Sequence, residues 1–108
     1  MKYGLKDSVI QKIQNVFSTF DEVDTVVLYG SRAKGNYKEG SDIDLVCKGN
    51  NLNLSLLNKI ELKLDELFLP FTFDLSIYQQ IDNPDLINHI DRVGIEFYNR
   101  VTRINNIT

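Results

Sequence analysis

The sequence has little of what several classes of protein require. Its 108 residues include one cysteine, Cys47, which cannot form an internal disulfide or supply a zinc–thiolate cluster. This scarcity of thiols favours a reducing cytoplasm. Basic residues are not in excess, since 12 Lys and Arg stand against 15 Asp and Glu, and this balance argues against extensive binding to a nucleic-acid backbone.

Long apolar runs are also missing. Residues 1–12 contain no continuous apolar segment, and no later stretch approaches the ~20 apolar residues that span a bilayer. We therefore expect no membrane role. A chain of 108 residues with 43% apolar side chains can bury a core, and we expect residues 1–108 to form a single domain without a linker or repeat.

Hydrophobic periodicity predicts the element order helix, strand, strand, helix, strand, helix. Apolar residues recur at helical spacing over residues 9–20, 57–67 and 86–97, where the last helix begins near Pro84. Short β-branched or alternating runs predict strands over residues 23–29, 41–47 and 71–77. A polar tail is predicted over residues 101–108.

The connections between these elements predict an α/β (α+β) fold with a small mixed sheet and helices packed on one face. The first two strands are joined by about a dozen residues without a long helix, so they can lie antiparallel. A helix separates the second strand from the third, which favours a parallel, right-handed crossover. On the opposite face of the sheet, Asp42, Asp44 and Asp74 would converge beside the turn formed by Gly30 and Ser31.

Three converging carboxylates indicate a metal site. Two unit charges ~4 Å apart repel by about 4 kcal/mol at an effective dielectric near 20, so the cluster requires a counter-charge. Oxygen ligands suit Mg²⁺, which completes its coordination with substrate phosphates. Asp42 and Asp44 would lie on one face of a strand and could bridge two ions ~3.5–4 Å apart, with Asp74 as a further ligand. Because Mg²⁺ completes its coordination with phosphates, the predicted substrate is a polyphosphate.

The loop between the first two strands supplies groups suited to that substrate. Gly30 allows the backbone to approach a phosphate closely, and Ser31 offers a hydroxyl and a candidate helix N-cap. Arg32, Lys34 and Lys38 add positive charge, and Arg32 is predicted to contact the nucleotide. The spacing differs from that of a Walker loop, because no GxxxxGK[ST] sequence is present.

These residues together resemble a known family. Gly30-Ser31, ten further residues, and then Asp42-x-Asp44 match the signature of the DNA polymerase β nucleotidyltransferase superfamily, and the small chain is similar to its minimal nucleotidyltransferases (MNT). The resemblance implies that Asp42 and Asp44 bind both metals, that Asp74 completes the site and activates the attacking hydroxyl, and that the Gly-Ser pair holds the triphosphate. One departure is Lys34, where relatives often have arginine.

The resemblance also implies a function and a partner. Many MNT proteins are encoded beside a HEPN-domain RNase toxin and act as antitoxins that transfer AMP from ATP to a toxin tyrosine. We therefore expect a magnesium-dependent nucleotidyltransferase that uses ATP and two Mg²⁺ ions and modifies a HEPN toxin. Alternatives are transfer to a small molecule with a separate helical substrate-binding subunit, and a non-catalytic binding antitoxin. The sequence leaves the acceptor, the nucleotide base and a homodimer open.

Several of these residues also have a purely structural interpretation. Asp74 could belong to the solvated face of a one-sided sheet, and Arg32 could be an ordinary loop residue. His89, the single histidine, is interpreted as a surface or packing residue of the last helix. Cys47 is interpreted as a small core residue.

Overall fold

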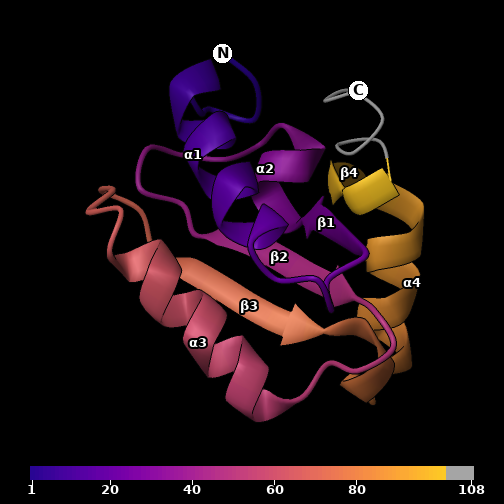
Figure 1. Ribbon diagram of the computed structural model, residues 1–108. Coiled ribbons are helices and arrows are strands. Elements are labelled where there is room, and N and C mark those ends of the chain that lie inside the picture. The colour runs from indigo at the N-terminus through magenta and orange to yellow at the C-terminus, as the bar shows by residue number, and fades with distance from the viewer. Residues whose placement is uncertain (102–108) are drawn as a thin grey trace.

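A four-stranded mixed sheet forms the centre of the protein, as the computed structural model of the chain shows over residues 1–101 (Figure 1). The strand order is β3-β2-β1-β4. The strands are β1 (Thr25–Tyr29), β2 (Ile43–Lys48), β3 (Phe73–Ile77) and β4 (Ile95–Asn99). Except for Val101, the predicted polar tail lies outside the described residues.

The predicted strand directions are confirmed. β1 pairs antiparallel with β2, and β2 pairs parallel with β3. The crossover between β2 and β3 is α3 (Leu54–Asp65), whose first turn is capped because the side chain of Asn53 accepts a hydrogen bond from the Leu56 N–H at 2.8 Å. After β3 the chain makes a short 3-10 helix, η1 (Tyr78–Gln80).

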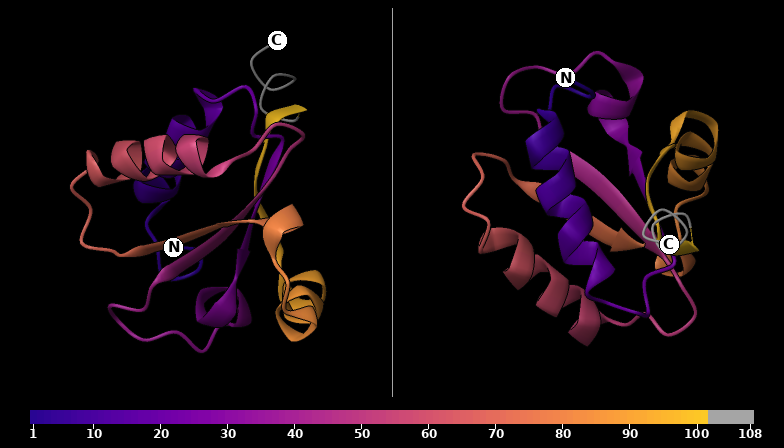
Figure 2. Two further views of the ribbon diagram at one scale, coloured as in Figure 1. Left: turned by 90° about the horizontal axis from the view of Figure 1, so that it is seen from below. Right: turned by 45° about the horizontal axis from the view of Figure 1, so that its top comes forward.

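One face of the sheet carries the main core. α1 (Asp7–Ser18) and α3 lie side by side across this face, as both views in Figure 2 show. Their apolar sides meet the inward-facing residues of the strands, and the largest fully buried side chains there include Phe17, Ile13, Leu45 and Ile60. Cys47 is buried in the same core, as predicted, and burial raises the pKa of its thiol to about 12.

The other face is not bare, which refines the expectation that helices pack on one face. The short α2 (Gly30–Lys34) and α4 (Pro84–Val93) lie on the side of the sheet opposite α1 and α3 (Figure 2). A second, smaller cluster of buried residues forms there from Tyr29, Val46 and Ile90. No helix within residues 1–101 is long and apolar enough to cross a membrane.

The last predicted helix, over residues 86–97, extends beyond the helix that the structure shows. α4 ends at Val93, and the residues after Gly94 form β4, which pairs antiparallel with β1. Val93 and Phe97 are four residues apart and therefore fit a helical pattern. In the structure, however, Phe97 belongs to β4, and its side chain is buried in the main core. Its carbonyl oxygen accepts a hydrogen bond from Gln14 Nε2 of α1 at 2.8 Å.

Candidate active site

Strand pairing brings the Gly30 turn and two of the predicted aspartates to one region of the sheet. Asp44 of β2 is the register partner of Tyr29 on one side and of Asp74 on the other. Gly30 follows Tyr29 directly, so the end of β1 lies beside Asp44. Because β2 and β3 are parallel and in this register, Asp44 and Asp74 occupy neighbouring positions on the same face.

Gly30 lies against the carboxylate of Asp44. Its φ of +73° belongs to the left-handed region, and a Cβ built at this position would collide with Asp44 Oδ2. Any other residue would therefore strain the backbone and displace the carboxylate. This contact couples the first half of the Gly-Ser signature to the second aspartate of the DxD signature.

Asp44 is a partly buried carboxylate without full compensation of its charge. Burial and then the charges of Asp74 and Asp42 raise its pKa to about 6, and the charge of Arg32 opposes this rise. Asp42 precedes β2 and is exposed, as is Asp74. Asp42 and Asp74 are thus near enough to repel the carboxylate of Asp44, and a cation would relieve that repulsion.

Asp42, Asp44 and Asp74 are not gathered tightly around one point. Within residues 1–101, no three acidic, histidine or cysteine side chains are grouped closely enough to enclose an ion together. The full convergence predicted for Asp42, Asp44 and Asp74 is therefore not seen in the structure. The donor set still fits Mg²⁺, because all three groups offer carboxylate oxygens and a neighbouring cation would oppose the rise in the pKa of Asp44.

Tyr29 borders the same region. Burial raises the pKa of its hydroxyl, the Ser76 hydroxyl beside it opposes this, and the charges of Asp74 and Asp44 raise it again. The ring belongs to the second core cluster with Val46 and Ile90. Tyr29 therefore joins the carboxylate region to the small core beneath α4.

Arg32 holds the loop together. Its guanidinium is buried and donates to the Ser41 carbonyl oxygen from Nε at 3.1 Å and from Nη2 at 2.8 Å, and to the Tyr3 carbonyl oxygen from Nη1 at 2.9 Å. The same group lies 5.4 Å from the ring centroid of Tyr37 and 5.1 Å from that of Phe71. These contacts favour a structural role for Arg32 over the predicted nucleotide contact.

That structural role bears directly on the aspartates. Ser41 immediately precedes Asp42, so the two hydrogen bonds from Arg32 to the Ser41 carbonyl oxygen fix the backbone at the start of β2. Phe71 leads into β3, which carries Asp74, and its ring stacks on the same guanidinium. A cavity of about 610 Å³ adjoins this stack and is lined partly by Arg32, Tyr37 and Phe71.

The remaining loop residues are more open to solvent. Ser31 is half-buried in the first turn of α2, but the N-cap position belongs to Tyr29, so the predicted N-cap role of Ser31 is wrong. Lys34 and Lys38 are exposed. The Ser41 hydroxyl accepts a hydrogen bond from the Lys38 backbone N–H at 2.8 Å, which closes the loop before Asp42.

His89 was missed as a residue of this region. Its Nε2 accepts a hydrogen bond from the Gly30 N–H at 3.2 Å, and its ring meets the Tyr29 ring nearly edge-on, with centroids 6.2 Å apart. The residue lies 59 positions after Gly30, and its place depends on α4 packing on the second face of the sheet. No local pattern in the sequence signals this contact.

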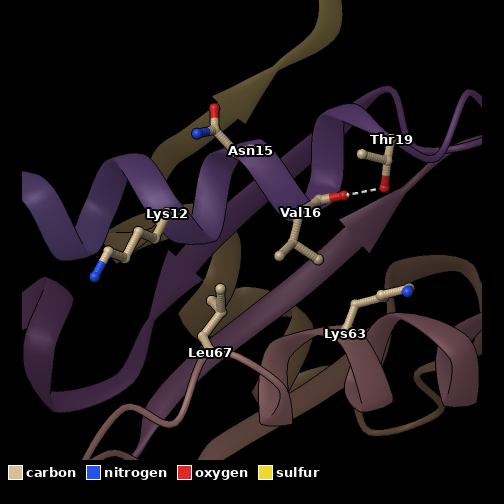
Figure 3. A pocket seen from close by; sticks show the side chains of 6 residues that line it. All are labelled: Lys12, Asn15, Val16, Thr19, Lys63 and Leu67. Carbon is tan, nitrogen blue, oxygen red and sulfur yellow. Dashed lines mark hydrogen bonds between the residues drawn. The ribbon is translucent and has the colours of Figure 1, made fainter.

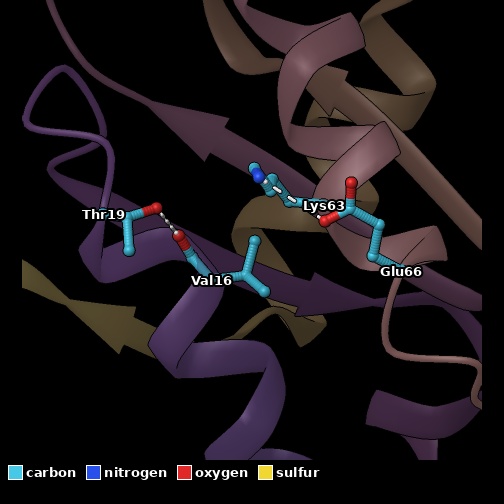
Figure 4. A network of polar contacts seen from close by, with 4 residues as sticks. All are labelled: Val16, Thr19, Lys63 and Glu66. Carbon is cyan, nitrogen blue, oxygen red and sulfur yellow. Dashed lines mark hydrogen bonds and ion pairs between the residues drawn. The ribbon is translucent and has the colours of Figure 1, made fainter.

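A groove on the opposite face is separate from the aspartates. It has a volume of about 490 Å³ and lies between α1 and α3, lined by Lys12, Asn15, Val16, Thr19, Lys63 and Leu67 (Figure 3). Thr19 Oγ1 donates to the Val16 carbonyl oxygen at 2.7 Å, and Lys63 pairs with Glu66 at 3.5 Å (Figure 4). Because this ion pair is exposed, it contributes little to stability. The groove brings no catalytic groups together.

Comparison with known proteins gives a family. The family described as polymerase beta, nucleotidyltransferase matches residues 11–103 of the chain. A protein of Methanocaldococcus jannaschii, provisionally named a protein adenylyltransferase, is 28% identical over 98 residues, which cover 82% of this chain and 94% of that protein.

Solved structures show the same fold. A crystal structure of a toxin-antitoxin with AMP-PNP superposes with a TM-score of 0.67 at 18% identity and covers 95% of this chain and 87% of that chain. The structure of a tri-AMPylated Shewanella oneidensis HEPN toxin in complex with an MNT antitoxin gives a TM-score of 0.65 at 14% identity, with 94% and 78% of the two chains covered.

Proposed function

The chain belongs to the polymerase beta nucleotidyltransferase family, and from this premise we propose that it transfers AMP from ATP to a HEPN-domain toxin and acts as its antitoxin. The observation that carries the proposal is the contact between Gly30 and the Asp44 carboxylate, with Asp74 as the neighbour of Asp44 in the sheet. This contact would join the turn proposed to bind phosphate to the proposed metal ligands.

Two Mg²⁺ ions are the proposed cofactors. Asp42 and Asp44 would hold both ions and Asp74 would complete the ligand set, since carboxylate oxygens are the ligands that Mg²⁺ prefers. When bound, the ions would neutralise the triphosphate and make the α-phosphate more electrophilic. The raised pKa of Asp44 supports this assignment, because a cation beside the carboxylate would relieve both its partial burial and the repulsion from its neighbours.

The chain's own residues would orient the substrate and move one proton. The N–H and the hydroxyl of Ser31, which follows Gly30 in the turn, would hold the β- and γ-phosphates. Asp74 would accept the proton of the acceptor hydroxyl, whose oxygen forms a bond to the α-phosphorus of ATP. The bond from that phosphorus to the bridging oxygen breaks, and pyrophosphate leaves beside Ser31. The products are an AMP ester of the acceptor and pyrophosphate.

The acceptor is proposed to be a tyrosine of the toxin. Asp42 and Asp74 are exposed, so a side chain on the surface of another macromolecule can reach them. A phenol has a reference pKa near 10 and is a weak nucleophile at neutral pH, which makes a carboxylate base beside the attacking oxygen necessary. The name of the M. jannaschii relative and the AMPylated HEPN toxin in the S. oneidensis complex both support a protein acceptor.

The decisive experiment combines mass and activity. The chain is incubated with ATP, Mg²⁺ and the HEPN protein proposed as its partner, and the HEPN protein should gain one or a few units of about 329 Da while its RNase activity falls. Asp42→Asn combined with Asp44→Asn is the control and should abolish the mass gain. Silencing of the RNase by this double variant without a mass gain would instead establish a binding antitoxin. Modification of a small molecule alone would refute the protein acceptor.

A further inference from the structure

His89 contacts the Gly30 turn from outside the sequence signature that defines the site. α4, which carries it, packs beside β1 and α2 (Figure 1). We propose that His89 is a positioning residue for the nucleotide: its Nε2 holds the Gly30 peptide in the orientation that lets the turn receive the triphosphate. This inference rests on the proposed function, because it assigns a role in the same site.

The Gly30 peptide needs an external partner to hold its orientation. A glycine populates positive and negative φ about equally, so its own conformational preference does not maintain the φ of +73°. Gly30 also opens α2, and the first N–H groups of a helix have no acceptor within that helix. His89 Nε2 supplies the missing acceptor at 3.2 Å. The same peptide keeps the Gly30 Cα against the carboxylate of Asp44.

The capping and packing of α4 fix the position of the His89 imidazole. α4 begins with Pro84, and the side chain of Asn83 caps it by accepting from the Asp85 N–H at 2.9 Å. Ile90, the next residue after His89, is 2% exposed and packs with Tyr29 and Val46. The edge-on Tyr29 ring then limits rotation of the imidazole. A rigid helix therefore presents one acceptor atom to the turn.

The hydrogen bond specifies which nitrogen carries the proton. An imidazole nitrogen accepts only through its lone pair, so a bond from the Gly30 N–H to Nε2 requires a neutral ring with its hydrogen on Nδ1. A residue that merely fills space on α4 would have no such requirement. This difference separates the positioning role from the packing role expected from the sequence.

Two substitutions of equal length separate the acceptor from the packing. In His89→Gln the side-chain carbonyl oxygen can take the place of Nε2, whereas His89→Met retains a flexible side chain of similar size without a strong acceptor. We expect His89→Met to raise the KM for magnesium-ATP about 10-fold with little change in kcat. The lost hydrogen bond holds the turn and not the reacting atoms, so its loss weakens substrate binding. His89→Gln should restore most of the affinity.

Calorimetric binding of magnesium-ATP to the HEPN-free chain gives the same comparison without turnover. Equal behaviour of the Gln and Met variants, whether both normal or both impaired, would overturn the inference. If the wild-type chain binds no magnesium-ATP, the proposed function fails and this inference fails with it, whereas normal wild-type binding with an unaffected Met variant refutes the role of His89 alone.

Nitrogen-15 spectroscopy of the wild-type chain tests the contact even if the Met variant does not fold. We expect the neutral ring to carry its proton on Nδ1, and we expect the Gly30 amide resonance to shift in His89→Gln. A ring protonated on Nε2 in the neutral state would overturn the inference.

Discussion

Replacement of Asp44 by asparagine should stabilise the protein, although it removes a residue of the proposed site. The pKa of Asp44 rises from 3.8 to about 6 on folding, chiefly through burial and then through the charges of Asp74 and Asp42. One pKa unit corresponds to 1.36 kcal/mol, so a shift of two units sets an upper limit of about 3 kcal/mol on the cost of ionising the group. Asp44 is partly exposed, and solvent screening reduces this to about 1 kcal/mol.

The sign of the effect sets its pH dependence. Because the folded-state pKa exceeds the unfolded-state value, the folded protein binds the proton more tightly, and stability is lost as the pH rises from about 4 through about 6. Asp44→Asn removes this loss. The free energies of unfolding of variant and wild type should therefore agree near pH 4 and differ by about 1 kcal/mol at pH 7, or roughly 4–8 °C in Tm for a domain of this size.

Urea denaturation at pH 4, 5, 6 and 7 measures the difference. Asp21→Asn is a matched control, because Asp21 is exposed and lies before the start of β1. The Gly30 turn that contacts Asp44 lies after the other end of β1. Asp21→Asn should show no comparable gain. Added Mg²⁺ should stabilise the wild type and leave Asp44→Asn nearly unchanged. A gain that persists undiminished at pH 4, or no gain at pH 7, would refute the account of Asp44 as an uncompensated carboxylate.

Three further substitutions test neighbouring parts of the site. Asp74→Asn should lower AMP transfer by about 100-fold in single-turnover assays while calorimetry shows only a modest change in magnesium-ATP affinity, and near-normal transfer would contradict its role as a base. Gly30→Ala should cost about 1–3 kcal/mol in urea denaturation and weaken magnesium-ATP binding, because its Cβ meets the Asp44 carboxylate and its φ is positive. Arg32→Lys should destabilise the fold by about 2–3 kcal/mol in the same assay, since lysine lacks the planar group whose three nitrogens donate to the Ser41 and Tyr3 carbonyl oxygens, and unchanged stability would show that these bonds contribute little.

The sequence predicted those features that depend on local pattern. Strict alternation over residues 71–77 identified β3 and its polar side, and the element order gave the correct directions of β1, β2 and β3. β4 was missed because its residues also fit the spacing of the helix before it. The contacts of Arg32 and His89 were missed because each depends on a partner distant in the sequence, Tyr3 in one case and Gly30 in the other.

The pairing of β4 with β1 affects the order in which the protein can assemble during synthesis. β1 lies in the interior of the sheet, yet one of its two neighbours comes from residues 95–99, near the end of the described chain. Until those residues are made, β1 presents an open edge, and unpaired edges promote association with other chains. A nascent chain would therefore be most vulnerable to aggregation after β2 and β3 have formed and before Ile95–Asn99 joins them.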